Sequence, residues 1–445
     1  MSEVRKNVNV ILVGSNPLPC YIQAAYVMRE GERTQKEMEA GLVKPDIVLF
    51  VATKETDIFI DYIIEVLSKN VASFSEYKFK RIIIDDIYDS AGIERKTKEE
   101  LEDINKNPDT RIGKILLNNT GGTKAMAVYA TAGIRGLSFY NSIKVTECFV
   151  DPHKNQIRCY KAGTMETSCW PEQGSLKDVV QLSIKQLVFL HYGGVEIKYD
   201  DLNGQNYEKL TKEQCDVARS IMSGKNKDED YKIYEEFFFA CNKEVKRKKK
   251  DSCLEHLKKV IEERKEVVCK MQQIFEAATG RKWNFNEEKN QIELLPFMDG
   301  RWLEMYFYNA LLEVKKTLKE TGIELQTAWS YKVERSNSNK NFELDVLALR
   351  GYELILFSIS MAGTGSDEHL AKGKWFEAVY RTEQMAGEHG KAILVNFLRD
   401  KKGRKTLEEF AMDLKTFKRD VQIINREDLI DYNGLLETIE KIING

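Results

Sequence analysis

Four short apolar runs near the start of the chain constrain its fold more than any other feature. They lie within residues 8–14, 45–52, 80–85 and 114–118, and each contains at least three consecutive hydrophobic residues. Strands of this kind are buried on both faces, whereas a strand with one wet face alternates apolar and polar residues. Helix-like segments lie between and after the runs. The pattern therefore predicts an α/β fold, in which a parallel sheet is covered by helices on both faces.

Two loops that follow predicted strands carry small polar residues suited to anions. Residues 14–19 read Gly-Ser-Asn-Pro-Leu-Pro, and residues 118–124 read Asn-Asn-Thr-Gly-Gly-Thr-Lys. Ligands of parallel sheets bind beyond the carboxyl ends of the strands. Adjacent glycines let the backbone approach a ligand, and the helix start beyond them favours an anion. The second loop is neither a P-loop nor a GxGxxG turn. It is either an anion site or an ordinary strand-to-helix turn with a threonine cap.

The motif Asn-x-Thr-Gly-Gly-Thr-Lys-x-Met, after a first strand that ends Gly-Ser-Asn-Pro-Leu-Pro, resembles the CRISPR-associated Rossmann-fold (CARF) sensor domains. The resemblance implies a homodimer that binds a cyclic oligoadenylate, with cyclic tetra-adenylate favoured, made by type III CRISPR complexes. A two-fold dimer would place two copies of the loops around one cavity. The implied ligand contacts are Ser15, Asn16, Pro17, Asn118, Thr120, Gly122, Thr123 and Lys124, with Thr53 as a weaker candidate.

Length and composition bound the remaining possibilities. The chain has 445 residues, 42% hydrophobic and 31% charged, which is typical of a soluble protein of roughly three domains. Its formal net charge of −2 gives no overall attraction to nucleic acid. Eight cysteines without a CxxC pair, no secretory leader and no apolar stretch of membrane-spanning length predict a cytoplasmic protein with reduced thiols and no membrane contact.

We expect three regions: a sensor domain at 1–160, a mostly helical linker or insertion at 161–290, and a further α/β domain at 291–445. The basic run at 243–250 in the middle region is either a solvated helix end or a patch that contacts phosphates. The last region reads as an α-β-β-β-α-β order. In its strand at 341–348, Glu343 and Asp345 alternate with apolar residues, so both carboxylates share one face.

A helix glutamate, Glu304, followed by Glu-x-Asp on a strand resembles the PD-(D/E)XK nuclease superfamily, a restriction-endonuclease-like fold. Gly-Arg-Trp-Leu-Glu and Phe-Glu-Leu-Asp-Val are also similar to the nuclease half of CARF-fused nucleases. Three carboxylates within about 5 Å repel one another by several kcal/mol, so the arrangement calls for a cation. Mg²⁺ or Mn²⁺ suits such oxygen ligands, activates water and neutralises charge on a phosphodiester.

One feature departs from the family pattern. The Glu-x-Lys of the third strand should fall at 358–360, where the sequence has Ser358 and Ser360. Either the missing groups have moved to the following helix or the nuclease fold is inactive. Lys374, Glu377, Arg381 and Gln384 share one helical face, which favours the first account over a solvated ladder of salt bridges. Glu377 would then be a metal ligand with Glu304 and Asp345, and Lys374 (or Lys372) the charge stabiliser.

These patterns predict a cyclic-oligoadenylate-activated, metal-dependent endonuclease of antiviral defence that cleaves or nicks RNA, DNA or both. The predicted catalytic residues are Glu304, Glu343, Asp345, Lys374 and Glu377. Two alternatives stay open. One is a nuclease-inactive sensor that binds nucleic acid or a protein partner, as Ser358 and Ser360 suggest. The other is a sensor that slowly degrades its own ring ligand with the help of Lys124 and the Ser15 loop.

Overall fold

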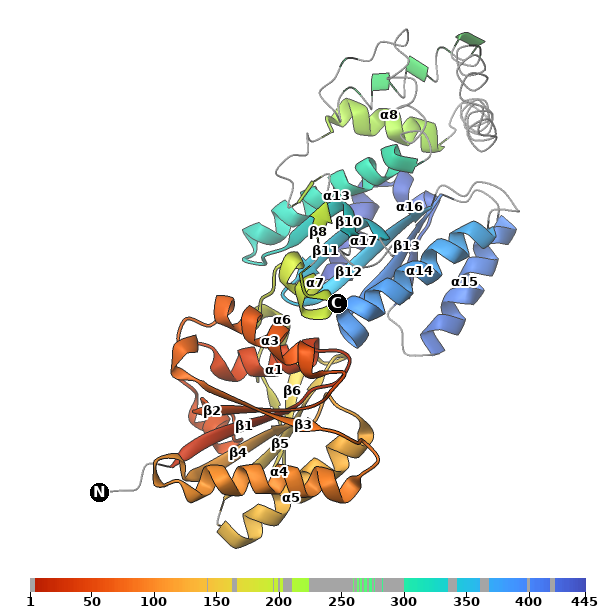
Figure 1. The fold of residues 1–445 in the computed structure, drawn as a ribbon. Helices are drawn as coiled ribbons and strands as arrows, with labels where there is room; N and C mark the ends of the chain where they lie inside the picture. Colours follow the sequence, from red (N-terminus) through yellow and green to blue (C-terminus); the bar gives the residue numbers. More distant parts are fainter. Residues whose placement is uncertain are drawn as a thin grey trace. The chain divides into compact units, whose positions relative to one another are not determined.

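A computed structural model describes residues 5–141, 143–161, 166–194, 196–198, 201–202, 210–223, 300–334, 342–360, 368–397, 401–416 and 421–445, with scattered positions between 259 and 282. The chain forms two compact units (Figure 1). The first is Met1–Val195 with Gly351–Glu353 and Glu383–His389, and the second is Glu196–Arg350, Leu354–Thr382 and Gly390–Gly445. The basic run at 243–250 lies outside the described residues, as does most of the predicted helical middle region.

The first unit is built on a seven-stranded sheet in the order β3-β2-β1-β4-β5-β6-β7. The first five strands along the chain are parallel, and β6 and β7 add antiparallel partners at one edge. All four apolar runs are strands of this sheet; β1 and β2 are buried almost throughout, whereas β3 lies at the edge and is exposed at several positions. The strands are β1 (Lys6–Leu12), β2 (Ile47–Thr53), β3 (Lys78–Ile84), β4 (Ile112–Asn118), β5 (Lys144–Asp151), β6 (Gln156–Lys161) and β7 (Thr167–Trp170).

Helices cover both faces of this sheet (Figure 1). Helices α4 (Ser90–Lys106) and α5 (Lys124–Asn141) pack together on one face, and α1 (Leu18–Met28) and α3 (Asp57–Asn70) lie on the other. Asp89 caps helix α4 by accepting the N–H of Gly92. Helices α6 (Leu176–Val179) and α7 (Ile184–Tyr192) follow the last strand.

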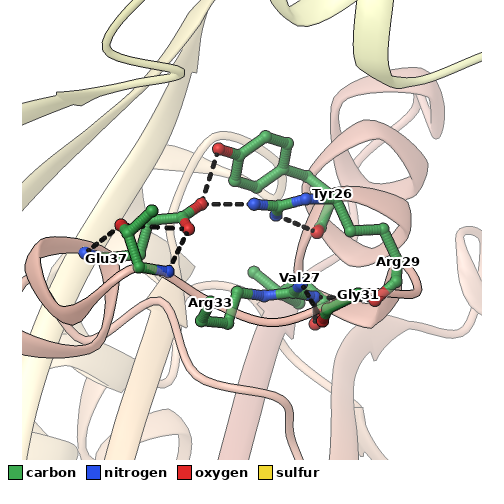
Figure 2. Close-up of polar contacts among 7 residues, drawn as sticks. Tyr26, Val27, Arg29, Gly31, Arg33 and Glu37 are labelled. Atoms are coloured by element: carbon green, nitrogen blue, oxygen red, sulfur yellow. Dashed lines mark hydrogen bonds and ion pairs between the residues drawn. The ribbon is translucent and has the colours of Figure 1, made fainter.

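A buried polar network fixes the chain between α1 and β2 (Figure 2). Glu37 of the short helix α2 (Gln35–Glu39) accepts a hydrogen bond from the Tyr26 hydroxyl at 3.0 Å and pairs with Arg29. Arg33 donates to the carbonyls of Val27 and Arg29 at 3.0 and 2.9 Å. These carbonyls belong to the end of α1, where a helix has no partners of its own for them. The network therefore terminates α1 with satisfied backbone groups.

The second unit is built on a sheet in the order β14-β13-β12-β11-β10-β8, with β9 paired to β10 as well. Its strands are β8 (Glu196–Lys198), β9 (Asp201–Leu202), β10 (Gln326–Glu334), β11 (Phe342–Arg350), β12 (Glu353–Ser360), β13 (Lys391–Asn396) and β14 (Val421–Ile424). Strands β12, β13 and β14 are parallel, and β10 runs antiparallel to β11. The predicted α-β-β-β-α-β order is present and is followed by a helix, the strand β14 and two further helices.

One face of this second sheet is covered by α13 (Trp302–Glu320) and α17 (Tyr432–Asn444), which form the larger core with α8 (Lys212–Ser223) and α16 (Arg426–Ile430). The other face carries α14 (Glu368–Ala386) and α15 (Lys401–Thr416), where Trp375 packs against Phe410. The cores on both faces are apolar.

The units divide at residues 195 and 196, while the sequence places divisions at 160 and at 290, which stay predictions. Strands β8 and β9 explain the difference. The sequence gives no strand signal for 196–202, yet these residues pair with β10. Three-residue and two-residue strands are too short to show a hydrophobic period, so only the neighbouring strand reveals them. Among the described residues, no helix is both long enough and apolar enough to cross a bilayer.

Candidate functional site

The loops after β1, β2 and β4 meet at the carboxyl ends of these strands, and we call residues 14–17, 53–56 and 118–124 the loop cradle. Strand β1 lies between β2 and β4 in the sheet. The chain continues from β1 to β2 on one side, whereas β4 pairs with β1 on the other side. That crossing point is where ligands of open parallel sheets bind. The Thr56 hydroxyl donates to the carbonyl of Val13 at 3.2 Å and joins two of the three loops.

Glycine is required in the cradle because backbones touch there. A Cβ on Gly14 would lie 2.7 Å from the Gly122 nitrogen, and a Cβ on Gly121 would lie 2.2 Å from the Leu12 carbonyl oxygen. Gly122 also has a φ of +77°, which side chains disfavour. The two predicted ligand loops are therefore packed directly on each other. The sequence pattern predicts that Gly121-Gly122 let the backbone approach a ligand closely, and the contact between the two loops is a second reason for these glycines.

Asn118 and Thr120 use part of their hydrogen-bonding capacity within the cradle. Asn118 Oδ1 accepts from the Thr120 N–H and hydroxyl at 3.0 and 2.7 Å, and the Thr120 hydroxyl accepts the Val150 N–H at 2.8 Å. Asn118 is fully buried, and its Nδ2 has no hydrogen-bond partner among the described residues. A buried donor without an acceptor is costly. The Thr120 hydroxyl, by contrast, already has two partners.

The start of α5 provides the cationic side of the cradle. Thr123 Oγ1 accepts the Met126 N–H at 3.2 Å, which caps the helix, and Lys124 is exposed in its first turn. A helix start with an adjacent lysine is an anion-binding arrangement. Thr53, at the end of β2, is buried, and its backbone N–H donates to the Thr56 hydroxyl at 3.0 Å.

The side chains of the loop after β1 have different surroundings, and one of them, Asn16, also contacts helix α7. Ser15 is exposed and Pro17 is buried at the start of α1. Asn16 Oδ1 accepts the Leu18 N–H at 3.1 Å and lies 3.1 Å from His191 Nε2. Burial lowers the pKa of His191 to about 4, so this imidazole is neutral near pH 7. Asn16, predicted as a ligand contact, is thus already held by α1 and α7.

The second set of candidate residues gathers around Asp345 of β11. Asp345 Oδ2 accepts the Ile359 N–H of β12 at 2.8 Å, and the Ser358 side chain also hydrogen bonds to this carboxylate. Lys374 of α14 places its Nζ 3.0 Å from the Ile359 carbonyl and 4.0 Å from Asp345 Oδ2. Burial raises the pKa of Asp345, and the Lys374 ammonium opposes that rise. The lysine predicted to have moved onto the helix lies beside the strand carboxylate.

Glu304, in the first turn of α13, completes a pair of partly buried acids. Trp329 of β10 donates its indole N–H to Glu304 Oε2 at 3.1 Å, and the Arg301 guanidinium lies 5.0 Å from the Trp329 ring centroid. Burial and the neighbouring Asp345 charge raise the pKa of Glu304 to about 7. Two carboxylates that resist simultaneous ionisation mark an acid–base or cation site.

Glu343 lies two residues before Asp345 and is more exposed, at 46% of its side chain against 18% for Asp345. Its Oε1 accepts the Ser330 hydroxyl at 2.6 Å and lies 3.6 Å from Lys332 Nζ. The Glu343 charge also contributes to the raised pKa of Asp345, so the two carboxylates are electrostatic neighbours. We call Glu304, Glu343 and Asp345, with Lys374 and the Ile359 carbonyl, the carboxylate cluster.

No protein-family model and no curated protein matches the chain. Among solved structures, protein VC1899 from Vibrio cholerae is similar over 98% of this chain and 98% of its own, with a TM-score of 0.59 and 13% identity. Can2 from Sulfobacillus thermosulfidooxidans, solved in complex with cyclic tetra-adenylate, is similar over 97% of this chain and 96% of its own, with a TM-score of 0.55 and 16% identity. This chain has the fold of the CARF-type effectors.

The CARF-type fold confirms the predicted fold class, a mixed α/β chain with a parallel-rich first sheet and a second sheet. It does not bring every predicted site residue together. Glu377 pairs with Arg381 at 3.5 Å, and Arg381 lies over the Phe342 ring. Lys372 lies over the Phe410 ring, and Gln384 accepts from the Tyr192 hydroxyl at 3.4 Å. Of the four residues on that helical face, Lys374 is the one found at Asp345.

Several residues of the two sites carried no usable sequence signal. Trp329 and Ser330 belong to β10, and a tryptophan or serine in a strand has no distinctive spacing relative to Glu304 or Glu343. His191 is far from Asn16 in the chain and stands in an ordinary helical pattern. Each became recognisable through a hydrogen bond to a predicted residue. Tertiary contact is the signal that the sequence lacks.

The carboxylate cluster supplies oxygen atoms of the kind that a divalent cation binds. The described residues contain no group of three or more His, Cys, Asp and Glu side chains arranged to hold a metal. They do provide the Glu304 and Asp345 carboxylates, with the Ile359 carbonyl oxygen beside Asp345. Mg²⁺ and Mn²⁺ are commonly held by one or two carboxylates with other oxygen ligands. The raised pKa values of both acids are the expected result of placing two such ligands together, so the residues fit this ion.

Proposed function

We propose that this protein is a metal-dependent endonuclease activated by a cyclic oligoadenylate, with cyclic tetra-adenylate as the first ligand to test. The observation that carries the proposal is the carboxylate cluster, in which Lys374 contacts Ile359 beside Asp345 and Glu304. Two partly buried acids that would hold a divalent ion, with one cationic side chain beside them, are suited to hydrolysing phosphodiesters. The proposed substrate is RNA, DNA or both.

The loop cradle supports the activator. Its exposed Lys124 and the start of α5 are suited to the phosphates of a nucleotide ring. Can2, which shares the fold, was solved with cyclic tetra-adenylate. Val128 and Tyr129, exposed at 61% and 36%, follow Lys124 on α5 and support a homodimer through this side of the unit. A two-fold axis there would bring two cradles around one ligand.

Within the carboxylate cluster each residue has a proposed role. Glu304 and Asp345, with the Ile359 carbonyl, would hold Mg²⁺ or Mn²⁺, which supplies an activated water and charge neutralisation when bound. Lys374 keeps a positive charge beside Asp345 and would stabilise the developing negative charge on the phosphate. Glu343, on the solvent side, would accept a proton from water. Ser358 steadies Asp345 at the position where the family pattern expects an acid.

Helix α14 gives activation a physical route. Its residues up to Thr382 belong to the second unit, including Lys374, and its last residues belong to the first. In the first unit a Cβ on Gly387 would lie 2.1 Å from Asn16 Nδ2, so the end of this helical segment packs against the loop that follows β1. A ligand that moves this loop would favour one arrangement of α14 over another.

Purified protein incubated with Mn²⁺, labelled single-stranded RNA and DNA, nicked duplex, and cyclic tetra-adenylate tests the proposal. Cleavage that requires both the ring and the metal is the expected result. Linear tetra-adenylate and a chelator serve as matched controls for the ligand and the metal. Absence of ring-dependent cleavage on all these substrates would contradict the nuclease assignment.

A nuclease-inactive sensor is the second candidate, and Ser358 and Ser360 favour it because both lack the acid and lysine of the family pattern. This candidate predicts nucleic-acid or partner binding that responds to the ring and is unchanged by Asp345→Ala. The nuclease proposal predicts that Asp345→Ala abolishes cleavage while ring binding persists. Analysis of the recovered ring by mass spectrometry also tests self-degradation, since the ring stays intact if the cradle only binds it.

A further inference from the structure

Ser330 has an unusual backbone for its place in the fold. It lies within β10, is 2% exposed, and has a φ of +50°. The other described non-glycine residue with positive φ is Asn155, which follows the β5 strand in a turn, where asparagine tolerates this conformation. A buried serine in a strand has no comparable tolerance of a positive φ. Such strain is unfavourable and persists where the surrounding structure requires it, often at functional sites.

The strained residue faces the carboxylate cluster. In the β10–β11 ladder, Trp329 pairs with Val346 and Tyr331 pairs with Leu344, which leaves Ser330 opposite Asp345. The Ser330 hydroxyl donates to Glu343 Oε1 at 2.6 Å, a short bond to a charged acceptor. The neighbouring residue Trp329 donates to Glu304. Two consecutive residues of β10 therefore hold two of the three carboxylates.

Glu343 needs such a partner because its surroundings leave it free to move. Its side chain is 46% exposed, and its ionic contact with Lys332 is 3.6 Å long, between side chains that are both open to solvent. An exposed ion pair of this kind fixes a side chain weakly. The Ser330 hydroxyl is buried with its residue, and it supplies the shorter contact of the two.

We propose that Ser330 is a positioning residue that holds the Glu343 carboxylate beside Asp345, and that its strained backbone is retained for this purpose. The inference rests on the proposed nuclease function for the meaning of Glu343. It assigns the outer carboxylate of the cluster to a fixed orientation, as a proton acceptor from water requires. If Ser330 only filled space, replacing it with glycine would raise the stability of the protein without slowing cleavage.

Three substitutions distinguish a serine that positions Glu343 from a serine that only fills space. Ser330→Gly removes both the hydroxyl and the strain, and it should raise the thermal midpoint while slowing cleavage about 10–100-fold. Ser330→Ala removes the hydroxyl and keeps the strain, so it should slow cleavage equally without the gain in stability. Ser330→Asn keeps a donor and tolerates positive φ, so it should restore cleavage to within about 5-fold of the wild-type rate. Lys332→Gln, which removes the exposed partner of the same carboxylate, is the matched control and should change the rate less than about 2-fold.

The measurements are single-turnover cleavage with saturating ring, the thermal midpoint, and Mn²⁺ affinity by electron paramagnetic resonance. A Ser330→Gly variant that cleaves at the wild-type rate overturns the inference. Wild-type protein that binds Mn²⁺ but never cleaves overturns the proposed nuclease function instead. In that case the affinity for Mn²⁺ decides the inference. The affinity should weaken about 10-fold in Ser330→Gly and Ser330→Ala and return to the wild-type value in Ser330→Asn. Equal affinity in all variants, or no Mn²⁺ binding by the wild type, overturns it.

Discussion

The loop cradle and the carboxylate cluster hold polar groups in opposite ways. In the cradle, backbone segments of Gly14, Gly121 and Gly122 pack directly on one another, and most side-chain oxygens already have partners. In the carboxylate cluster, side chains from α13, β11 and α14 meet, and the pKa values of Glu304 and Asp345 are raised. A site built from packed backbone is preformed and stable. Clustered carboxylates, in contrast, repel one another, and a bound cation would reduce that repulsion.

The largest expected effect is on the cradle itself. Gly121→Ala places a Cβ against the Leu12 carbonyl, which cannot move without disturbing β1. We expect the unfolding midpoint of the first unit to fall by on the order of 10 °C, or the protein to become insoluble. Gly136→Ala is the matched control, because its Cβ would meet open space in α5 and alanine favours helix. Differential scanning calorimetry makes the measurement, and equal midpoints would contradict a backbone-built site.

The second effect concerns catalysis. Asp345→Asn should slow ring-activated cleavage about 1,000-fold or more, since it removes the central charge of the cluster. Glu377→Gln is the comparison, and it also decides the sequence-based prediction that Glu377 is a metal ligand. Because Glu377 pairs with Arg381, we expect its loss to change the rate less than about 5-fold. Single-turnover rates at saturating Mn²⁺ give the answer, and equal losses would place Glu377 in the site.

The third effect is on stability as a function of pH. The pKa of Glu304 is raised to about 7, above its value in an unfolded chain, because burial and Asp345 disfavour its charge. Its contribution to stability is therefore full below about pH 4.3 and is lost as the pH rises through about 7. Glu304→Gln should unfold at a higher temperature than wild type at pH 8, and the difference should shrink at pH 5.

Mn²⁺ gives this pH prediction its control. The ion should raise the midpoint of the wild type at pH 8 and leave Glu304→Gln nearly unchanged, since stabilisation by a ligand requires binding to the folded state. Thermal unfolding with and without metal at the two pH values is sufficient. A midpoint of the wild type that does not respond to Mn²⁺ at pH 8 would indicate that the acids serve another purpose.

The smallest effect is on ligand affinity. Lys124→Ala should weaken ring binding about 10-fold, which corresponds to one charge-assisted contact, without changing the unfolding midpoint because the side chain is exposed. Lys144→Ala removes the same charge at the other end of the sheet, at the start of β5, and should leave affinity unchanged. Isothermal titration calorimetry distinguishes the two, and equal losses would indicate nonspecific attraction.

The sequence was most informative where a physical requirement is local. Continuous apolar runs predicted the parallel strands, and Gly121-Gly122 after such a run marked the turn from β4 into α5. The position of Asp345 on a strand face and of Lys374 on the next helix also followed from spacing. The sequence was least informative for β8 and β9, which are too short to carry a period and form because β10 offers an edge.

What the sequence by itself determined is the set of chemical groups and the elements that carry them, because hydrophobic period, glycine pairs and helical spacing are properties of neighbours in the chain. Tertiary structure alone decided which groups share an environment. It placed Lys374 at Asp345 and left Glu377 with Arg381, although both lie on one helical face. It also raised the pKa of Glu304 and set Ser330 against Glu343, since burial and contact across strands depend on residues far apart in sequence.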